Sequence, residues 1–318
     1  GRQVALRLAA RADLVISNFR PGVMERLGLG YDDVRAVNPA CVYAVLTAYG
    51  RHGPIARQPG MDVAVQARSG VMAITGDGSG PPVKPGVSLA DFGGGVHLTT
   101  AVLAALYQRE RTGRGQRVDV SLLDATMSML INYSVAVRDG GARLSAMGSG
   151  HPQLVPFQAF PSADGHVVIA TGTNRLFTDL CRVLGTPGLA ADPRFVSNTD
   201  RVTHRAELVE LLSEITQRRT TGEWLRVFEE QQIPCAPVNT MDQALRDEQL
   251  ESNGMVVEVE HPKYGTLHLL GSPYKFACQP PPDWQPPPML GEHTRQVLSA
   301  VLGLSEQDLD ELAGEHVI

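Results

Sequence analysis

The sequence has few cysteines, no surplus of positive charge and no long uninterrupted apolar run. Its four cysteines, Cys41, Cys181, Cys235 and Cys278, are scattered with no C-x-x-C pair. This argues against a zinc site or a disulfide framework and favours a reducing compartment, the cytoplasm. The formal net charge is -6, so we expect no nucleic-acid surface. The run AVLAALY is too short to span a bilayer, so we expect no membrane segment and no signal peptide.

Two catalytic signatures are also missing. There is no G-x-S-x-G nucleophile elbow and no Walker loop, which disfavours a serine hydrolase or a P-loop enzyme. The opening GRQVALRLAARA has the apolar spacing of a helix but neither a methionine nor a cap. We therefore expect the natural beginning of the protein to be missing from this chain.

With 318 residues, of which 43% are hydrophobic, the chain has material for two domains. The segments DLVISNF and CVYAVLTAYG alternate with helical patterns, which predicts an α/β domain with a parallel sheet. Such sheets bind ligands beyond the carboxyl ends of their strands. FQAFPSADGHVVIATG then predicts two strands around an Asp-Gly turn, opening a smaller α+β domain. The extended tether QPPPDWQPPPML leads to two short helices that return to the first domain. We expect a large domain of residues 1–149 and 272–318 and a small domain of residues 150–271.

The stretch VSLADFGGGV places Asp91 before three consecutive glycines. The preceding residues predict a loop feeding a short strand, and the following ones predict a helix that stops at Gly113. One interpretation is that Asp91 caps this helix, which local sequence alone favours. The other is that Asp91 is a nucleophile that forms an acyl intermediate. Gly93, Gly94 and Gly95 would then form a loop for close approach of a substrate, with N–H groups available for an oxyanion.

Arg20 and Arg26 follow the first predicted strand and are suited to paired hydrogen bonds with phosphates. His97 follows the glycines and fits a packed core position as well as a catalytic one. Ser121 and Asp124 have the spacing of a capping box, so we interpret Asp124 as structural.

Several segments together resemble the class III CoA-transferase family, typified by formyl-CoA transferase and carnitine CoA-transferase. They are DLVISNFRPGVMERLGLGYDDV, PGMDVAVQARSG, ADFGGGVHLTTAVLAALYQRERTGRGQRVDVSLLDA and PPPMLGEHTRQVL. The resemblance implies a Rossmann-like large domain, a small domain and a homodimer of interlocked chains. It also implies that the family's opening strand-helix-strand segment is missing from this chain. It also implies that Asp91 is the catalytic aspartate, in place of the cap interpretation.

In such enzymes the aspartate attacks an acyl-CoA to give a mixed anhydride, and the thiolate then forms an aspartyl-CoA thioester. An incoming carboxylic acid attacks that thioester and receives CoA. The resemblance implies no prosthetic group and no metal; coenzyme A is a substrate. The residues implied to contact CoA are Asn18, Phe19, Arg20, Arg26, Pro59, Gly60, Met61 and Asp62.

Racemases of 2-methylacyl-CoA also resemble the chain, but they use a histidine and a glutamate where this sequence has Met61 and Asn174. Neither residue can remove a proton from an α-carbon, so a transferase is favoured. The surroundings of PGMD and the loop TGTNRLF differ from those of formyl-CoA transferases, so formate and oxalate are not favoured. Two other hypotheses stay open: a non-catalytic CoA-binding protein, and a nucleotide-binding α/β domain that uses the glycines as a phosphate loop.

Overall fold

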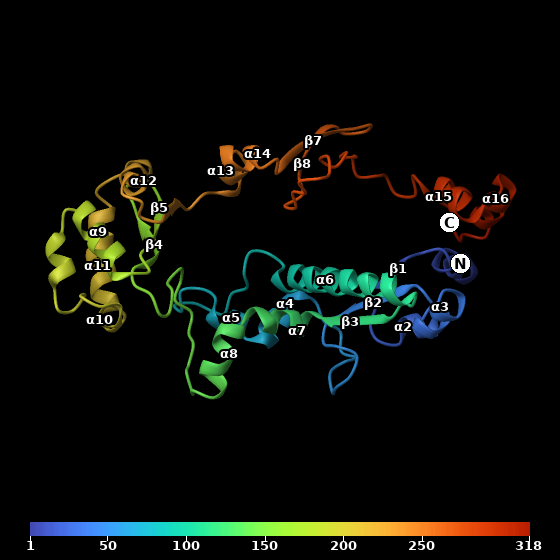
Figure 1. Cartoon of the computed structure of the whole chain (residues 1–318), viewed down its shortest axis with the longest axis horizontal. Helices are drawn as coiled ribbons and strands as arrows, with labels where there is room; N and C mark the ends of the chain where they lie inside the picture. The colour runs from blue at the N-terminus through green and yellow to red at the C-terminus, as the bar shows by residue number, and fades with distance from the viewer. The chain divides into compact units, whose positions relative to one another are not determined.

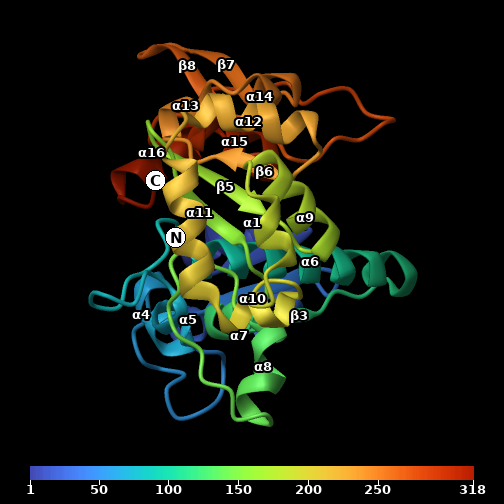
Figure 2. The same cartoon turned by 90° about the vertical axis from the view of Figure 1, so that its left-hand side faces the viewer.

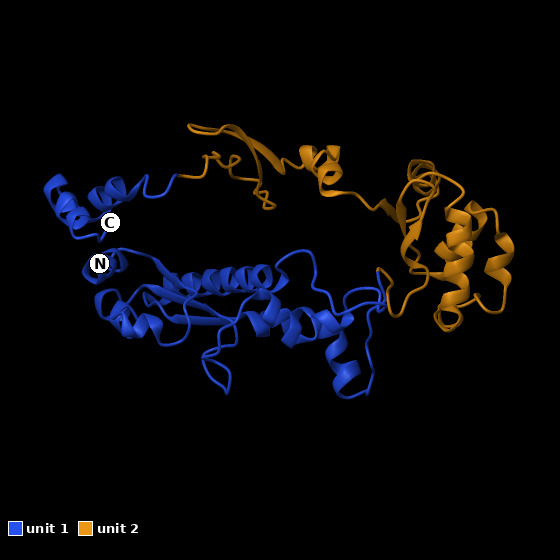
Figure 3. Ribbon diagram, turned by 180° about the vertical axis from the view of Figure 1, so that it is seen from behind, with its two compact units in different colours: residues 1–148, 289–318 blue, residues 149–288 orange.

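The computed structural model describes all 318 residues and divides them into two compact units, coloured separately in Figure 3. Unit 1 comprises residues 1–148 and 289–318, and unit 2 comprises residues 149–288. The expected border between 149 and 150 lies one residue from the observed one. The return to the first unit was expected at residue 272 and lies at Met289. Residues 272–288, which we call the strap, belong to unit 2. Several of their side chains line a cavity together with residues 252–257.

Unit 1 is built on a three-stranded parallel sheet with the order β1-β2-β3 (Figure 1). The strands are β1 (Leu14–Ser17), β2 (Val42–Thr47) and β3 (Arg117–Ser121). In the register, Leu14 lies opposite Val42, and Tyr43 lies opposite Arg117. β2 is buried along almost its whole length, as expected for a central strand covered on both faces. The predicted α/β fold with a parallel sheet is confirmed.

Helices cover this sheet, and the longest of them, α6 (Leu89–Thr112), lies along it in Figure 1. Leu98 and Val102 of α6 pack against Ala44 of β2. The C-terminal segment returns to the first helix, where Leu298 and Leu302 pack against Val4. The other helices of unit 1 are α1 (Arg2–Ala9), α2 (Val23–Arg26), α3 (Tyr31–Val37), α4 (Asp62–Ser69), α5 (Val71–Ile74), α7 (Leu122–Met129), α8 (Ile131–Arg138), α15 (Thr294–Leu302) and α16 (Glu306–Gly314).

Helix α6 starts earlier than the sequence predicted. The short strand expected just before Asp91 is absent, because the chain enters α6 at Leu89. The predicted stop at Gly113 is confirmed: this residue has φ +69° and its N–H donates to the Arg109 carbonyl oxygen at 2.7 Å. With 24 residues, α6 is long and apolar enough to cross a membrane by length and composition alone. Our expectation from uninterrupted apolar runs missed this property, although one face of α6 packs on the sheet.

Unit 2 contains an antiparallel sheet of order β4-β5-β6 and a separate β7-β8 hairpin. Helices α9 and α11 lie beside β5 in Figure 2 and enclose a core that includes Phe160, Phe177 and Trp224. The hairpin around the predicted Asp-Gly turn is confirmed. The elements are β4 (Phe157–Pro161), β5 (His166–Ala170), β6 (Cys235–Pro237), β7 (Val256–His261), β8 (Gly265–Leu270), α9 (Asn174–Val183), a 3-10 helix (Pro187–Ala191), α10 (Asn198–Thr203), α11 (Arg205–Thr216), α12 (Thr221–Glu230), α13 (Met241–Leu245) and α14 (Glu248–Ser252).

Candidate active site

The N-terminus of α6 is capped by a side chain from another helix. Asp91 is the third residue of α6, and Ser88 at the N-cap position makes no side-chain capping bond. Instead Asp62, the first residue of α4, accepts two backbone hydrogen bonds through Oδ1. The donors are the N–H of Ala90 at 2.8 Å and the N–H of Asp91 at 3.3 Å. The interpretation of Asp91 as the cap is therefore wrong, because Asp62 satisfies the free amides of this helix end.

This arrangement leaves the Asp91 carboxylate free for chemistry. The residue is exposed, and no hydrogen bond engages its carboxylate oxygens. Partial burial raises the pKa of the Asp91 carboxyl, and the negative charge of Asp62 adds to that rise. Because the residue keeps access to solvent, we expect the group to be ionised at neutral pH. It is then a somewhat more basic carboxylate than an isolated aspartate.

The three glycines lie inside α6 and not in a loop, which corrects our expectation for Gly93, Gly94 and Gly95. Their N–H groups therefore belong to the helix ladder and are not free to bind an oxyanion. A Cβ on Gly94 would lie 2.5 Å from Leu122 Cδ2, and one on Gly93 would collide with Met129 Cε. These two glycines let α7 approach α6 closely. Three glycines in a helix cost about 2–3 kcal/mol relative to alanine, and the close packing of α7 depends on two of them.

Gly95 differs from its two neighbours because a Cβ there would meet nothing within 4 Å. It lies four residues after Asp91, and residues at this spacing share one face of a helix. The surface beside the Asp91 carboxylate is therefore open on the C-terminal side.

A cationic cavity of about 480 Å³ lies at the end of β1. It brings together the predicted residues Phe19, Arg20 and Arg26 and adds Arg57, which sequence reasoning missed. Three arginines line this cavity, and no aspartate or glutamate does. Guanidinium groups bind phosphates through paired hydrogen bonds. Arg57 could have been found from its position in the loop after β2, because the loops that follow neighbouring parallel strands lie at the same edge of the sheet.

The other residues implied to contact CoA do not line this cavity. Asn18 is exposed directly after β1. Gly60 passes so close to the end of β2 that a Cβ would lie 2.9 Å from Tyr49 Cε2, and this approach requires glycine. Pro59 precedes it, and Met61, 76% exposed, leads into α4. The segment 59–62 thus delivers Asp62 to the end of α6.

Asn174 in unit 2 has a structural partner. Its Oδ1 accepts a hydrogen bond at 3.0 Å from Nη2 of Arg201, which is fully buried. The same guanidinium donates to the carbonyl oxygens of Val155 and Phe195 and lies over the ring of Phe177. Burial lowers the pKa of Arg201. Asn174 is therefore part of the scaffold of unit 2 and, as an amide, cannot act as a base.

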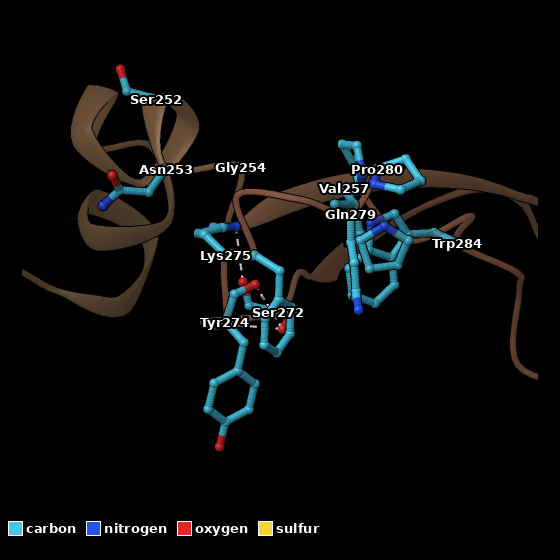
Figure 4. A pocket seen from close by; sticks show the side chains of 13 residues that line it. Ser252, Asn253, Gly254, Val257, Ser272, Tyr274, Lys275, Gln279, Pro280 and Trp284 are labelled. Atoms are coloured by element: carbon cyan, nitrogen blue, oxygen red, sulfur yellow. Dashed lines mark hydrogen bonds between the residues drawn. The ribbon is translucent and has the colours of Figure 1, made fainter.

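A second cavity, of about 500 Å³, lies within unit 2 (Figure 4). Tyr274, Phe276 and Trp284 line it together with prolines of the strap. Its one cationic side chain, Lys275, turns back to donate to the carbonyl oxygen of Ser272 at 2.9 Å. This cavity lacks the group of cations that a polyphosphate requires, so the cavity in unit 1 is the better anion site.

Comparisons with known proteins show the family of the chain. Residues 1–294 match the model of CoA-transferase family III. The chain belongs to this family. It is 34% identical to human succinyl-CoA:glutarate CoA-transferase over all 318 residues, which cover 73% of that protein. It is 36% identical to acetyl-CoA:oxalate CoA-transferase of Acetobacter aceti, covering 90% of this chain and 72% of the relative.

The solved structures of this family include a CAIB/BAIF family protein from Brucella suis. It superimposes on this chain with a TM-score of 0.84 at 33% identity, over 95% of this chain and 78% of the other. Family III membership confirms the resemblance recognised in the sequence. It also identifies the protein as a CoA-transferase family enzyme whose relatives act on acyl-CoA and carboxylates.

Proposed function

We propose that this protein moves CoA from an acyl-CoA donor to a free carboxylic acid through covalent intermediates on Asp91. One observation carries the proposal: Asp62 caps α6, so the Asp91 carboxylate projects from the first turn of the helix without a partner. The open face at Gly95 supplies room for the thioester. Membership of family III supports the same reaction class.

The reaction has four balanced acyl-transfer steps. An Asp91 oxygen attacks the thioester carbonyl, and the C–S bond breaks to give a mixed anhydride and CoA thiolate. The thiolate attacks the aspartyl carbonyl, which releases the donor acid as a carboxylate and leaves an aspartyl-CoA thioester. The acceptor carboxylate attacks this thioester and again expels the thiolate. The thiolate finally attacks the acceptor carbonyl of the new anhydride, which frees the new acyl-CoA and regenerates Asp91.

The raised pKa of Asp91 suits this chemistry. A more basic carboxylate is a better nucleophile as long as it stays ionised. The negative charge of Asp62 contributes to that basicity while its Oδ1 holds the helix end. Both effects come from one side chain, so the cap and the nucleophile act as a unit.

The cationic cavity is the proposed site for the phosphates of CoA. Arg20, Arg26 and Arg57 provide positive charge, and the exposed ring of Phe19 offers a surface for stacking. An acidic protein can bind a polyanion where its arginines gather locally. Asn18 and the segment 59–62 would then contact the remainder of the CoA molecule.

A dicarboxylic acid is the proposed acceptor class. Two of the relatives are named for glutarate and oxalate, which are both dicarboxylates. The protein is mixed with succinyl-CoA and a panel of monocarboxylic and dicarboxylic acids, and new CoA thioesters are identified by mass spectrometry. Glutaryl-CoA or another dicarboxylyl-CoA is the expected product. Absence of any new thioester would refute CoA transfer. Oxalate is included because residues around 59–62 differ from those of formyl-CoA transferases, and we expect it to be a poor acceptor.

The same assay separates the alternative functions. A racemase would change the configuration of 2-methylacyl-CoA without forming a new thioester. A non-catalytic CoA-binding protein would bind CoA and form no product, and a nucleotide-binding domain would bind NAD or ATP. Met61 and Asn174 support the transferase, because neither side chain can serve as the second base of a racemase.

A homodimer of interlocked chains is the proposed assembly. An exposed apolar stripe runs along α6 and comprises Phe92, Val96, Leu103 and Tyr107. Exposed Ile131 and Val135 on α8 extend the apolar surface of this unit. Apolar surface of this extent is characteristic of a protein interface, and a second copy of the chain is the partner that the family resemblance implies. Light scattering is expected to give the mass of two chains; a monomer would contradict the assembly.

A further inference from the structure

Gln66 is a fully buried side chain that lies one helical turn after Asp62 on α4. Its Nε2 donates to Asp62 Oδ2 at 2.6 Å and to the carbonyl oxygen of Val87 at 3.5 Å. Residues four apart on a helix face the same side, so the amide is placed to hold this carboxylate. Gln66 therefore joins α4, the segment before α6 and the capping group of α6.

The orientation of the Gln66 amide is determined by the carboxylate. Its Oε1 is buried and accepts no hydrogen bond. Turning the amide over would place Oε1 against a carboxylate oxygen, which repels it. A buried acceptor without a partner destabilises the fold. The Gln66 Oε1 atom stays without a partner, and in this orientation Gln66 Nε2 donates a buried hydrogen bond to Asp62.

We propose that Gln66 is a positioning residue for the transfer reaction, which fixes the Asp62 carboxylate and through it the first turn of α6 and the direction of Asp91. The inference rests on the proposed role of Asp91 as the nucleophile. Asp62 divides its two oxygens between these tasks: Oδ2 accepts from Gln66, and Oδ1 accepts from the N–H groups of Ala90 and Asp91. Gln66 itself is fully buried.

A kinetic signature follows from this chain of contacts. Without the Gln66 amide, the Asp62 carboxylate loses the donor that holds its Oδ2 at 2.6 Å. The cap at the start of α6 then loosens, and the Asp91 carboxylate is less well directed. The loss therefore falls on kcat and leaves the binding of acyl-CoA largely unchanged.

Other charged groups on the neighbouring elements are turned elsewhere. Arg68 of α4 is exposed and lies 5.9 Å from the centre of the Tyr49 ring. Asp124 of α7 is exposed, and His97 of α6 pairs with Ser128 at 2.9 Å. α5 carries no charged residue.

The test is Gln66→Met, which keeps the length of the side chain and removes the amide. Gln116→Met is the matched control, because Gln116 donates to Gln108 at 2.6 Å near the far end of α6. Gln66→Met is expected to lower kcat about 10-fold or more, since a displaced nucleophile reacts slowly. KM for acyl-CoA should change less than about 2-fold. Gln116→Met should behave as the wild type.

Gln66→Glu provides a second, conservative test. A protonated glutamic acid can donate to Asp62, whereas an ionised one repels it. Its activity relative to the wild type should be highest at low pH and should fall as the glutamate ionises. Wild-type kcat in Gln66→Met, or equal losses in Gln66→Met and Gln116→Met, would overturn the proposal. If Gln66→Met does not fold, the pH profile of Gln66→Glu decides alone.

A substrate-free measurement separates this inference from the proposed function. Hydrogen exchange at residues 88–95, followed by mass spectrometry, reports how firmly the first turn of α6 is capped. Gln66→Met is expected to speed this exchange, and unchanged protection would overturn the role of Gln66. If the wild type transfers no CoA, the proposed function fails, while hydrogen exchange still tests the link from Gln66 through Asp62 to α6.

Discussion

Replacing Asp62 by alanine is expected to loosen the first turn of α6. The change removes the acceptor of the Ala90 and Asp91 N–H groups, at 2.8 and 3.3 Å. It also removes the partner of buried Gln66 Nε2. Loss of an N-cap acceptor costs about 0.5–2 kcal/mol, and loss of the hydrogen bond from buried Gln66 to a carboxylate costs about 1–3 kcal/mol. We therefore expect local opening of this turn to become about 1.5–5 kcal/mol easier in Asp62→Ala.

Hydrogen exchange measured by mass spectrometry on a peptide spanning residues 88–95 checks this value. About 2 kcal/mol corresponds to roughly 30-fold faster exchange. Asp62→Asn is the matched variant, because asparagine is about as good an N-cap as aspartate, and it should leave exchange nearly unchanged. Retained protection in Asp62→Ala, or an equal loss in both variants, would refute the capping argument.

The asparagine variant also tests the electrostatic part of the argument. The charge of Asp62 contributes to the raised pKa of Asp91. Its removal therefore lowers that pKa toward its usual value, and the acid limb of kcat moves to lower pH. The plateau rate falls at the same time, because a less basic carboxylate is a weaker nucleophile. An acid limb that moves to higher pH would contradict this sign.

Three further predictions concern other parts of unit 1. Asp91→Asn should lower CoA transfer by about 10³-fold or more, since the amide is not nucleophilic; transfer assays check this. Arg57→Ala should raise KM for acyl-CoA about 5- to 20-fold with little change in kcat, whereas exposed Arg51, which does not line the cavity, should tolerate alanine. Gly94→Ala should destabilise the protein by up to about 2 kcal/mol, because overpacking against α7 costs about 1–3 kcal/mol and alanine favours the helix by about 0.5–1 kcal/mol. Gly95→Ala should stabilise the helix by about 0.5–1 kcal/mol yet slow transfer by narrowing the face beside the nucleophile; thermal unfolding and kinetics measure both.

Much of the architecture could be predicted from the sequence. Alternating apolar segments gave the parallel strands β1 and β2, and the Asp-Gly turn gave the β4-β5 hairpin. Gly113 marked the end of α6. These features depend on local periodicity and turn chemistry, which a single sequence carries. The end of β1 likewise pointed to Arg20 and Arg26 at a common cavity.

The start of α6 could not be predicted in the same way. Three glycines and an aspartate are typical of a loop or a cap, but the cap comes from Asp62, which is 28 residues before Ala90. Gly93 and Gly94 leave room for the side chains of Met129 and Leu122 on α7. No local sequence pattern reveals such contacts. The roles of Arg57 and Gln66 also depend on tertiary contacts. Family resemblance implied that Asp91 is the nucleophile, whereas the absence of a hydrogen-bond partner for its carboxylate became evident only in three dimensions.

The most direct test of the central claim is a chemical trap of the Asp91 carboxyl group. The protein is incubated with succinyl-CoA and quenched with hydroxylamine, which converts an aspartyl anhydride or thioester into a hydroxamate. Peptide mass spectrometry is then expected to find the hydroxamate at Asp91 only when the acyl-CoA is present. An unmodified Asp91 in protein that is turning over, or a modification at another carboxylate, would contradict the account.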